Sequence, residues 1–223
     1  MASKTHDTII RFYDDISHAQ EFISGKIRIG RLKYYRDMEA SDGRGDRNEG
    51  VSLLLKGDYT ILVGPANTPP TEATYRPFGL ASCIRFSDHS DLHSYILSLS
   101  RIEITVDEDT SMAKTLNAPL RELISSLMPH ASVVYGVLVL DGEEFMRRMM
   151  ALPIPVEGAP VSYTDLDTPR NRQMEVGAFT KDAKFKAQNE YRLKFMPEST
   201  ENHTYVDVGD LSKYVKLIEF PLK

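Results

Sequence analysis

The chain lacks several features that define common classes of protein. Cys83 is its only cysteine, so neither an internal disulfide bond nor a cysteine-rich zinc site can form. A single thiol is typical of proteins in a reducing compartment. The N-terminal residues MASKTHDT contain no apolar segment of the kind that signal peptides carry, and no apolar run approaches the roughly 18 residues of a membrane span. We therefore expect a cytoplasmic protein that does not enter a membrane.

Motifs for common catalytic and nucleotide-binding sites are also missing. The sequence contains no glycine-rich phosphate loop and no dinucleotide-binding fingerprint. No serine lies in a nucleophile elbow, and Cys83 lies in a predicted strand without an obvious histidine partner. His89 and His93 have the spacing of metal ligands on a helix, but no third ligand is nearby. We predict a surface pair of histidines and no metal site.

The balance of charge excludes one further class of function. The chain has 27 basic and 32 acidic residues, which gives a net charge of −5. Such a chain is not expected to bind nucleic acid or anionic membranes broadly and without specificity, although locally basic surfaces remain compatible with it. Its 223 residues can bury a substantial core, and we expect one globular domain over residues 1–223.

Hydrophobic periodicity predicts an α+β fold with a mixed, largely antiparallel sheet or sheets. We expect roughly seven to nine strands and three or four helices, without regular alternation of strand and helix. Strands are predicted over residues 8–13, 26–31, 80–86 and 101–106, with a hairpin over 51–63 that turns at Gly57 and Asp58. Residues 214–220 are predicted to form a last strand or a short helix. Helices are predicted after Asp15, over 88–100, over 120–128 and after Asp141. Residues 64–79 and 152–172 are rich in proline and are predicted to be long loops.

One apolar run identifies the centre of the sheet. Residues 133–140, VVYGVLVL, are rich in β-branched side chains and too few to cross a membrane. Because the run shows no polar face, we predict an interior strand that is covered on both sides.

A late stretch, KFKAQNEYRLKF over residues 184–195, alternates between polar and less polar side chains. The alternation predicts one strand of twelve residues, with Gln188, Glu190 and Arg192 in a row on its polar face. A glutamate held between an amide and a guanidinium on a strand is a pre-positioned acidic group. The alternative is a solvated sheet face with cross-strand ion pairs.

A charged loop is the second candidate site. Residues 42–50, DGRGDRNEG, combine acidic residues with Arg44, Arg47 and three glycines. The loop could close on a ligand, with Arg44 and Arg47 binding a phosphate. The alternative is a turn whose charges pair with one another. The acidic spacing does not match an EF-hand.

Three segments of the sequence resemble known groups of proteins. KIRIGRLKYYRDMEASDGRGDRNEG, FKAQNEYRLKF and VGDLSKYV look like segments of a large group of uncharacterised bacterial and phage proteins. FKAQNEYRLKF is also similar to the catalytic strand of ADP-ribosyltransferase folds, including the DNA-modifying toxin branch, where a strand presents Gln-x-Glu. Gln188 and Glu190 match that pattern. The Ser-Thr-Ser tripeptide of such enzymes is missing, no clear His-Tyr-Glu set is found, and Ser82 lies far from Glu190 in sequence.

The resemblance implies an ADP-ribosyltransferase-like enzyme that uses NAD, acting as a toxin or in phage–host conflict, with a nucleic acid or protein as acceptor. Glu190 would stabilise the positive charge that builds on the ribose as nicotinamide leaves, and Gln188 would position the acceptor. Arg11 would hold NAD, and Ser82 would take the place of the family's middle serine. Tyr34 or Tyr35 would stack on the nicotinamide, the alternative being that both tyrosines pack in the core or at its rim.

A second hypothesis is a non-catalytic module of the same fold. It would bind RNA or a protein through the basic residues of the first third and the basic face of residues 184–194. The residues concerned in the first third are Arg28, Arg31, Lys33 and Arg36. Salt-dependent binding of RNA without NAD turnover would favour this hypothesis over the enzyme.

Overall fold

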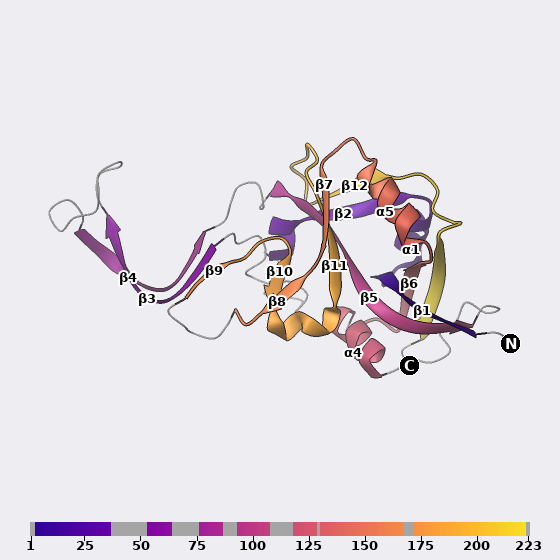
Figure 1. Ribbon diagram of the computed structural model, residues 1–223, viewed down its shortest axis with the longest axis horizontal. Coiled ribbons are helices and arrows are strands. Elements are labelled where there is room, and N and C mark those ends of the chain that lie inside the picture. The colour runs from indigo at the N-terminus through magenta and orange to yellow at the C-terminus, as the bar shows by residue number, and fades with distance from the viewer. Residues whose placement is uncertain are drawn as a thin grey trace.

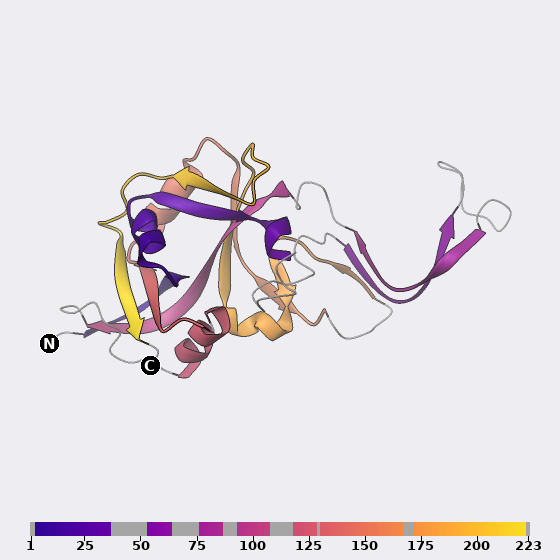
Figure 2. The ribbon, with the colours of Figure 1, turned by 180° about the vertical axis from the view of Figure 1, so that it is seen from behind.

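The computed structural model describes residues 3–36, 53–63, 76–86, 93–107, 118–128, 130–166 and 172–221. The protein has an α+β fold whose largest element is an eight-stranded sheet (Figures 1 and 2). Its strand order is β12-β2-β5-β1-β6-β13, and β11 pairs with both β5 and β7. Every pair in this sheet is antiparallel, which confirms the predicted fold class.

The elements have the following bounds. The main sheet contains β1 (Ser3–Tyr13), β2 (Lys26–Arg31), β5 (Tyr95–Asp107), β6 (Val133–Val139), β7 (Val156–Pro160), β11 (Glu190–Phe195), β12 (His203–Asp207) and β13 (Val215–Pro221). An antiparallel three-stranded sheet contains β3 (Leu53–Val63), β4 (Arg76–Phe86) and β9 (Arg172–Glu175), and a parallel pair contains β8 (Ser162–Thr164) and β10 (Thr180–Asp182). The helices are α1 (Ile16–Ile23), α4 (Ala118–Leu127), α5 (Gly142–Met150) and the 3₁₀ helix η1 (Ala183–Gln188), and residues 32–36 add a helical turn after β2.

Strand β6 is the predicted interior strand. It lies between β1 and β13, and Val134, Val137 and Leu138 are fully buried. Val137 packs into the core cluster that includes Phe22 of α1 and Phe145 of α5, whereas Val134 and Leu138 pack into the cluster that includes residues of α4. Both faces of β6 are therefore covered, which confirms the prediction over residues 133–139. Leu140 lies beyond the end of the strand and is 46% exposed, so the prediction is wrong for that residue.

The helices at residues 16–23, 118–127 and 142–150 are also confirmed, and two of them begin where an aspartate caps the first turn. Asp141 accepts a hydrogen bond from the backbone N–H of Glu144 at 2.9 Å. Asp15 accepts one from the backbone N–H of Ser17 at 2.8 Å. Each cap satisfies a donor that the first helical turn would otherwise leave unpaired. Among the described residues, no helix combines the length and apolar character that a membrane crossing requires.

The helix predicted over residues 88–100 is wrong where the structure describes it. Residues 95–100 form the first half of β5, and this half pairs with the whole of β11. Tyr95, Leu97 and Leu99 are buried in one core cluster, while Ser98 and Ser100 line a pocket. The apolar residues of this segment fit both the spacing of an amphipathic helix and the alternation of a strand. Pairing with neighbouring strands decides between the two structures.

One predicted turn and parts of both predicted loops are also wrong. Strand β4 already begins at Arg76, inside the loop predicted over residues 64–79. Strand β3 continues through Gly57 and Asp58 instead of turning there. The two residues are accommodated by an irregularity in the pairing with β4, between Lys56 and Tyr59. Residues 152–172 contain β7 and β8, which the prolines permit because Pro155 precedes β7 and Pro160 ends it. In both views the three-stranded sheet lies to one side of the main sheet (Figures 1 and 2).

Candidate functional site

The stretch over residues 184–195 is not one continuous strand. Residues 183–188 form η1, the backbone of Asn189 is left-handed with φ 41°, and β11 begins at Glu190. Asp182 starts the 3₁₀ helix by accepting a hydrogen bond from the N–H of Lys184 at 2.9 Å. Asparagine tolerates the left-handed conformation better than most residues, which lets the chain turn directly into the sheet. The predicted strand is therefore correct only in its second half.

Glu190 lies at the centre of a buried ionic cluster. Its side chain is 6% exposed, with Oε1 2.7 Å from Lys181 Nζ and Oε2 2.8 Å from Arg192 Nε. Lys181 Nζ also donates a hydrogen bond to Gln188 Oε1 at 2.7 Å. The solvated sheet face considered as an alternative does not form, because Gln188, Glu190 and Arg192 are all buried.

The two cations control the charge of Glu190. Burial alone would raise the pKa of its carboxyl group, but Arg192 and Lys181 outweigh burial and hold the pKa well below its usual value. The group is consequently a carboxylate at neutral pH. It can accept hydrogen bonds and present negative charge, but it has no proton to donate.

Surrounding groups fix the cluster in place. The backbone N–H of Glu190 donates to the Tyr163 hydroxyl at 2.8 Å, and burial raises the pKa of Tyr163 to about 12. Arg192 Nη1 donates to the carbonyl of Ala178 at 2.6 Å. Asn189 Nδ2 donates to the carbonyl of Arg101 at 2.9 Å, which ties the turn to β5. A site built this way is rigid before any ligand arrives.

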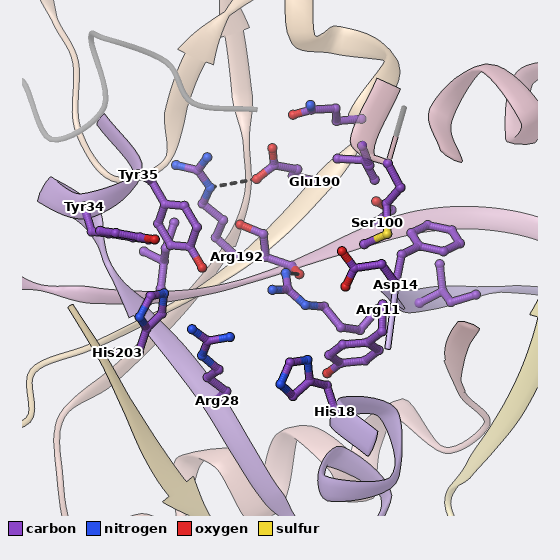
Figure 3. A pocket seen from close by; sticks show the side chains of 18 of the residues that line it. Arg11, Asp14, His18, Arg28, Tyr34, Tyr35, Ser100, Glu190, Arg192 and His203 are labelled. Atoms are coloured by element: carbon purple, nitrogen blue, oxygen red, sulfur yellow. Dashed lines mark hydrogen bonds and ion pairs between the residues drawn. The ribbon is translucent and has the colours of Figure 1, made fainter. Parts of the chain in front are cut away.

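Arg11 and Glu190 line the same pocket, which has a volume of about 300 Å³ (Figure 3). The sheet brings them together because β1 and β11 both pair with β5. Arg11 Nη1 donates to the carbonyl of Ser98, and the guanidinium also bonds Tyr35. Its Nε atom is buried without a hydrogen-bond partner among the described residues. A cation fixed on one side with an unsatisfied donor is suited to an anionic ligand.

Tyr34 and Tyr35 both line this pocket from the helical turn after β2. Tyr35 lies against Gly30, where a Cβ atom would be 2.6 Å from Tyr35 Cζ. The absence of a side chain at Gly30 is therefore what lets the Tyr35 ring reach the pocket. Tyr34 packs edge-on against His203, with ring centroids 4.5 Å apart.

Sequence reasoning missed several lining residues. Lys181 comes from β10, His18 from α1 and His203 from β12. Neither periodicity nor motif spacing marks these positions, since their proximity depends on how separate elements pack. The remaining described lining residues are Ile10, Phe12, Tyr13, Asp14, Glu21, Lys26, Arg28, Ile96, Ser98, Ser100, Leu127, Met128, Gln188 and Arg192.

Other predicted site residues lie elsewhere. Ser82 is in β4 of the three-stranded sheet, not in the sheet that carries Arg11 and Glu190. Arg44 and Arg47 lie outside the described residues. Within the described ranges, no group of three or more His, Cys, Asp or Glu side chains is placed to bind a metal.

The basic face predicted for a binding module does not form as one surface. Arg192 is buried beside Glu190, and Lys194 is partly buried with its Nζ 4.0 Å from Glu157 Oε2. Lys184 and Lys186 belong to η1 instead of continuing the strand. Arg31 donates to the carbonyl of Thr200 at 2.9 Å and contacts His93.

No protein-family model, curated protein or solved structure matches this chain. The case for a function therefore depends on the chemistry of the pocket.

Proposed function

We propose that the pocket binds NAD and cleaves its nicotinamide–ribose bond, as an ADP-ribosyltransferase-like enzyme. The observation that carries this proposal is the convergence of Arg11, Glu190, Tyr34 and Tyr35 on one pocket. They come from three separate parts of the chain: β1, the helical turn after β2, and the start of β11. No local pattern of sequence required these parts to meet.

Glu190 would act on the ribose. Each carboxylate oxygen can accept more than one hydrogen bond, so a ribose hydroxyl can donate to Glu190 while Lys181 and Arg192 remain in place. As the bond from C1′ to the nicotinamide nitrogen breaks, its electron pair leaves with nicotinamide and positive charge develops on the sugar. The fixed negative charge stabilises that state, and water or an acceptor then attacks C1′.

Arg11 would hold the phosphate nearest to the ribose. Five basic residues and three acidic residues line the described pocket, so its field favours an anionic ligand over a neutral one. The basic residues are Arg11, Lys26, Arg28, Lys181 and Arg192, and the acidic residues are Asp14, Glu21 and Glu190. Arg11 lines the pocket, so its guanidinium can pair with a phosphate oxygen bound there.

Tyr34 and Tyr35 would enclose the nicotinamide ring. A volume of about 300 Å³ is at the small end of ligand sites, which suits the nicotinamide riboside half of NAD better than the whole dinucleotide. The adenosine half would lie outside the pocket. Gln188 uses its amide oxygen to hold Lys181, so only its amide nitrogen is assigned to positioning an acceptor.

The test is nicotinamide release from NAD by the purified protein, with water alone and with candidate nucleic-acid and protein acceptors. We expect release by the wild type and a loss on the order of a hundredfold to a thousandfold in Glu190→Gln. Because Glu190→Gln also disturbs a buried cluster, Arg11→Lys provides a second variant. It keeps the charge but loses the planar fork that binds phosphate, and we expect KM to rise on the order of tenfold. The proposal is overturned if the folded wild type releases no nicotinamide under any of these conditions.

A further inference from the structure

The pocket opens onto one face of the paired strands β2 and β12. Arg28 lies opposite Tyr205 in this pair, and His203 lies opposite Gly30. Directly opposite residues share a face of an antiparallel pair, as do alternate residues along one strand. Lys26, Arg28, His203 and Tyr205 therefore share a face, while Ile27, Ile29 and Val206 are buried on the other.

Together with Tyr34, these four side chains form a basic–aromatic strip. Arg28, His203 and Tyr34 line the pocket, and Figure 3 shows Arg28 between His203 and His18. Tyr205 is not among the pocket-lining residues and is 43% exposed on β12, the edge strand of the sheet. Lys26 Nζ lies 4.5 Å from the centroid of the Tyr205 ring. The strip thus continues from the pocket along the edge of the sheet.

The charge on this strip is concentrated at Arg28. Lys26 forms an ion pair with Glu21 at 3.2 Å, and Asp207 lies opposite Lys26 in the strand pair. Arg28 is exposed, and its side chain forms no hydrogen bond or ion pair within the part of the chain that the structure describes. An exposed guanidinium beside aromatic rings can bind one phosphate while the rings stack on bases, which is how single strands are bound without a large basic surface.

We propose that the basic–aromatic strip binds single-stranded nucleic acid and delivers it to the pocket as the acceptor. The assignment as acceptor depends on the proposed NAD chemistry, whereas the binding itself does not. Arg28 contacts a backbone phosphate, Tyr205 stacks on a base outside the pocket, and His203 holds the nucleotide at the entrance. Because Tyr205 lies outside the pocket, a ligand that contacts it must extend beyond the pocket. With a single unpaired cation on the strip, binding is local and agrees with the acidic net charge of the chain.

The experiment measures binding of the full chain, without NAD, to labelled oligonucleotides of about ten nucleotides, within the range of known site sizes. Its arms are single-stranded RNA, single-stranded DNA, a DNA duplex and an acidic peptide of similar charge. We expect a single-strand arm to bind most tightly. Arg28→Ala should weaken binding on the order of tenfold at low salt and reduce the slope of log K against log salt by about 0.7. Tyr205→Ala should also cost on the order of tenfold, while Tyr205→Phe keeps the ring and should retain binding.

Arg121→Ala is the matched control, because Arg121 is an exposed arginine on α4, at the end of the sheet away from β2 and β12 (Figure 1). Equal losses in Arg28→Ala and Arg121→Ala would overturn the proposal, as would preference for the acidic peptide. Loss of oligonucleotide binding in saturating ADP-ribose would also overturn it, since the strip would then belong to the NAD site. If the wild type binds oligonucleotide specifically but releases no nicotinamide, the binding role of the strip is supported and the NAD-cleaving function is overturned. If it releases nicotinamide but binds no oligonucleotide, the NAD-cleaving function is supported and the binding role of the strip is overturned.

Discussion

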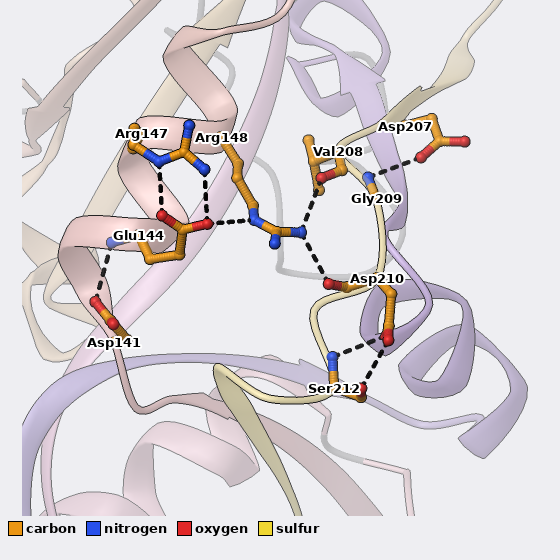
Figure 4. Close-up of polar contacts among 9 residues, drawn as sticks. All are labelled: Asp141, Glu144, Arg147, Arg148, Asp207, Val208, Gly209, Asp210 and Ser212. Carbon is orange, nitrogen blue, oxygen red and sulfur yellow. Dashed lines mark hydrogen bonds and ion pairs between the residues drawn. The ribbon is translucent and has the colours of Figure 1, made fainter.

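Two glutamates in this protein each contact two basic side chains, and they differ mainly in their access to water. Glu190 is buried between Lys181 and Arg192. Glu144 accepts from Arg147 Nε at 2.6 Å and from Arg148 Nε at 2.7 Å, but the Arg147 side chain is 66% exposed (Figure 4). Water competes for the contacts of Glu144, so these contribute little to stability, whereas a buried carboxylate depends on both partners.

The two clusters also serve different purposes. Arg148 extends from α5 to the carbonyls of Val208 at 3.2 Å and Asp210 at 2.8 Å, which ties the helix to the loop after β12 (Figure 4). The Glu190 cluster lines the pocket. The contacts are similar in length, but only burial next to a pocket turns an ion pair into a candidate for catalysis.

The largest expected difference between the clusters is in stability. Glu190→Gln removes the negative charge that Lys181 and Arg192 both contact in a buried cluster, and we expect a loss of about 3–5 kcal/mol in the free energy of unfolding. Glu144→Gln makes the same chemical change where water can solvate both arginines, and its effect should be much smaller. Urea unfolding of both variants measures the difference. Similar midpoints for the two would show that burial of Glu190 does not matter.

A double-mutant cycle sharpens the comparison further. Lys181→Met combined with Glu190→Gln should show a coupling of about 1–3 kcal/mol, because the two side chains are in direct contact. Arg148→Met combined with Glu190→Gln is the control, since Arg148 contacts Glu144 instead. The control pair should be additive within about 0.5 kcal/mol. If the coupling between Lys181 and Glu190 is also within about 0.5 kcal/mol, their contact contributes no interaction energy to stability.

A smaller effect is expected at Gly30, beside the pocket. Gly30→Ala forces Tyr35 to move, and we expect a loss of about 1–2 kcal/mol together with weaker NAD binding. Gly142→Ala is the matched control, because a Cβ at Gly142 meets no atom within 4 Å. Thermal unfolding and calorimetric titration with NAD measure the two effects. If Gly30→Ala behaves like Gly142→Ala in both, Tyr35 is not held as the structure places it.

Features that depend on local sequence were predictable. The cap at Asp141 and the covered strand at 133–139 follow from short-range patterns, and the structure has both. The pattern at residues 95–100 fits both a helix and a strand, and the outcome depends on β11, which lies about ninety residues away in sequence. The local sequence pattern does not reveal this long-range pairing.

The candidate site divides in the same way. Glu190 and Gln188 were selected from a local motif, and both lie in the pocket. Lys181 was missed because its contact with Glu190 requires the pairing of β10 with β8 and the turn through η1. The same turn buries Glu190, which alternation alone had placed on a solvated or half-exposed face.

The smallest expected effect concerns acid and salt. Hydrogen bonds from Arg147 and Arg148 lower the pKa of Glu144 to about 2. Because this value is below the roughly 4.3 of an unfolded glutamate, the contribution of Glu144 to stability is complete above about pH 4 and is lost as pH falls toward 2. The small difference in Tm between wild type and Glu144→Gln should therefore shrink over that range, and it should also shrink in high salt, which screens exposed charges.

The pKa of Glu190 is likewise held well below its usual value, but its partners are buried. The difference in Tm between wild type and Glu190→Gln should accordingly respond little to salt and persist to lower pH. Equal salt sensitivity of the two differences would contradict the distinction between the clusters.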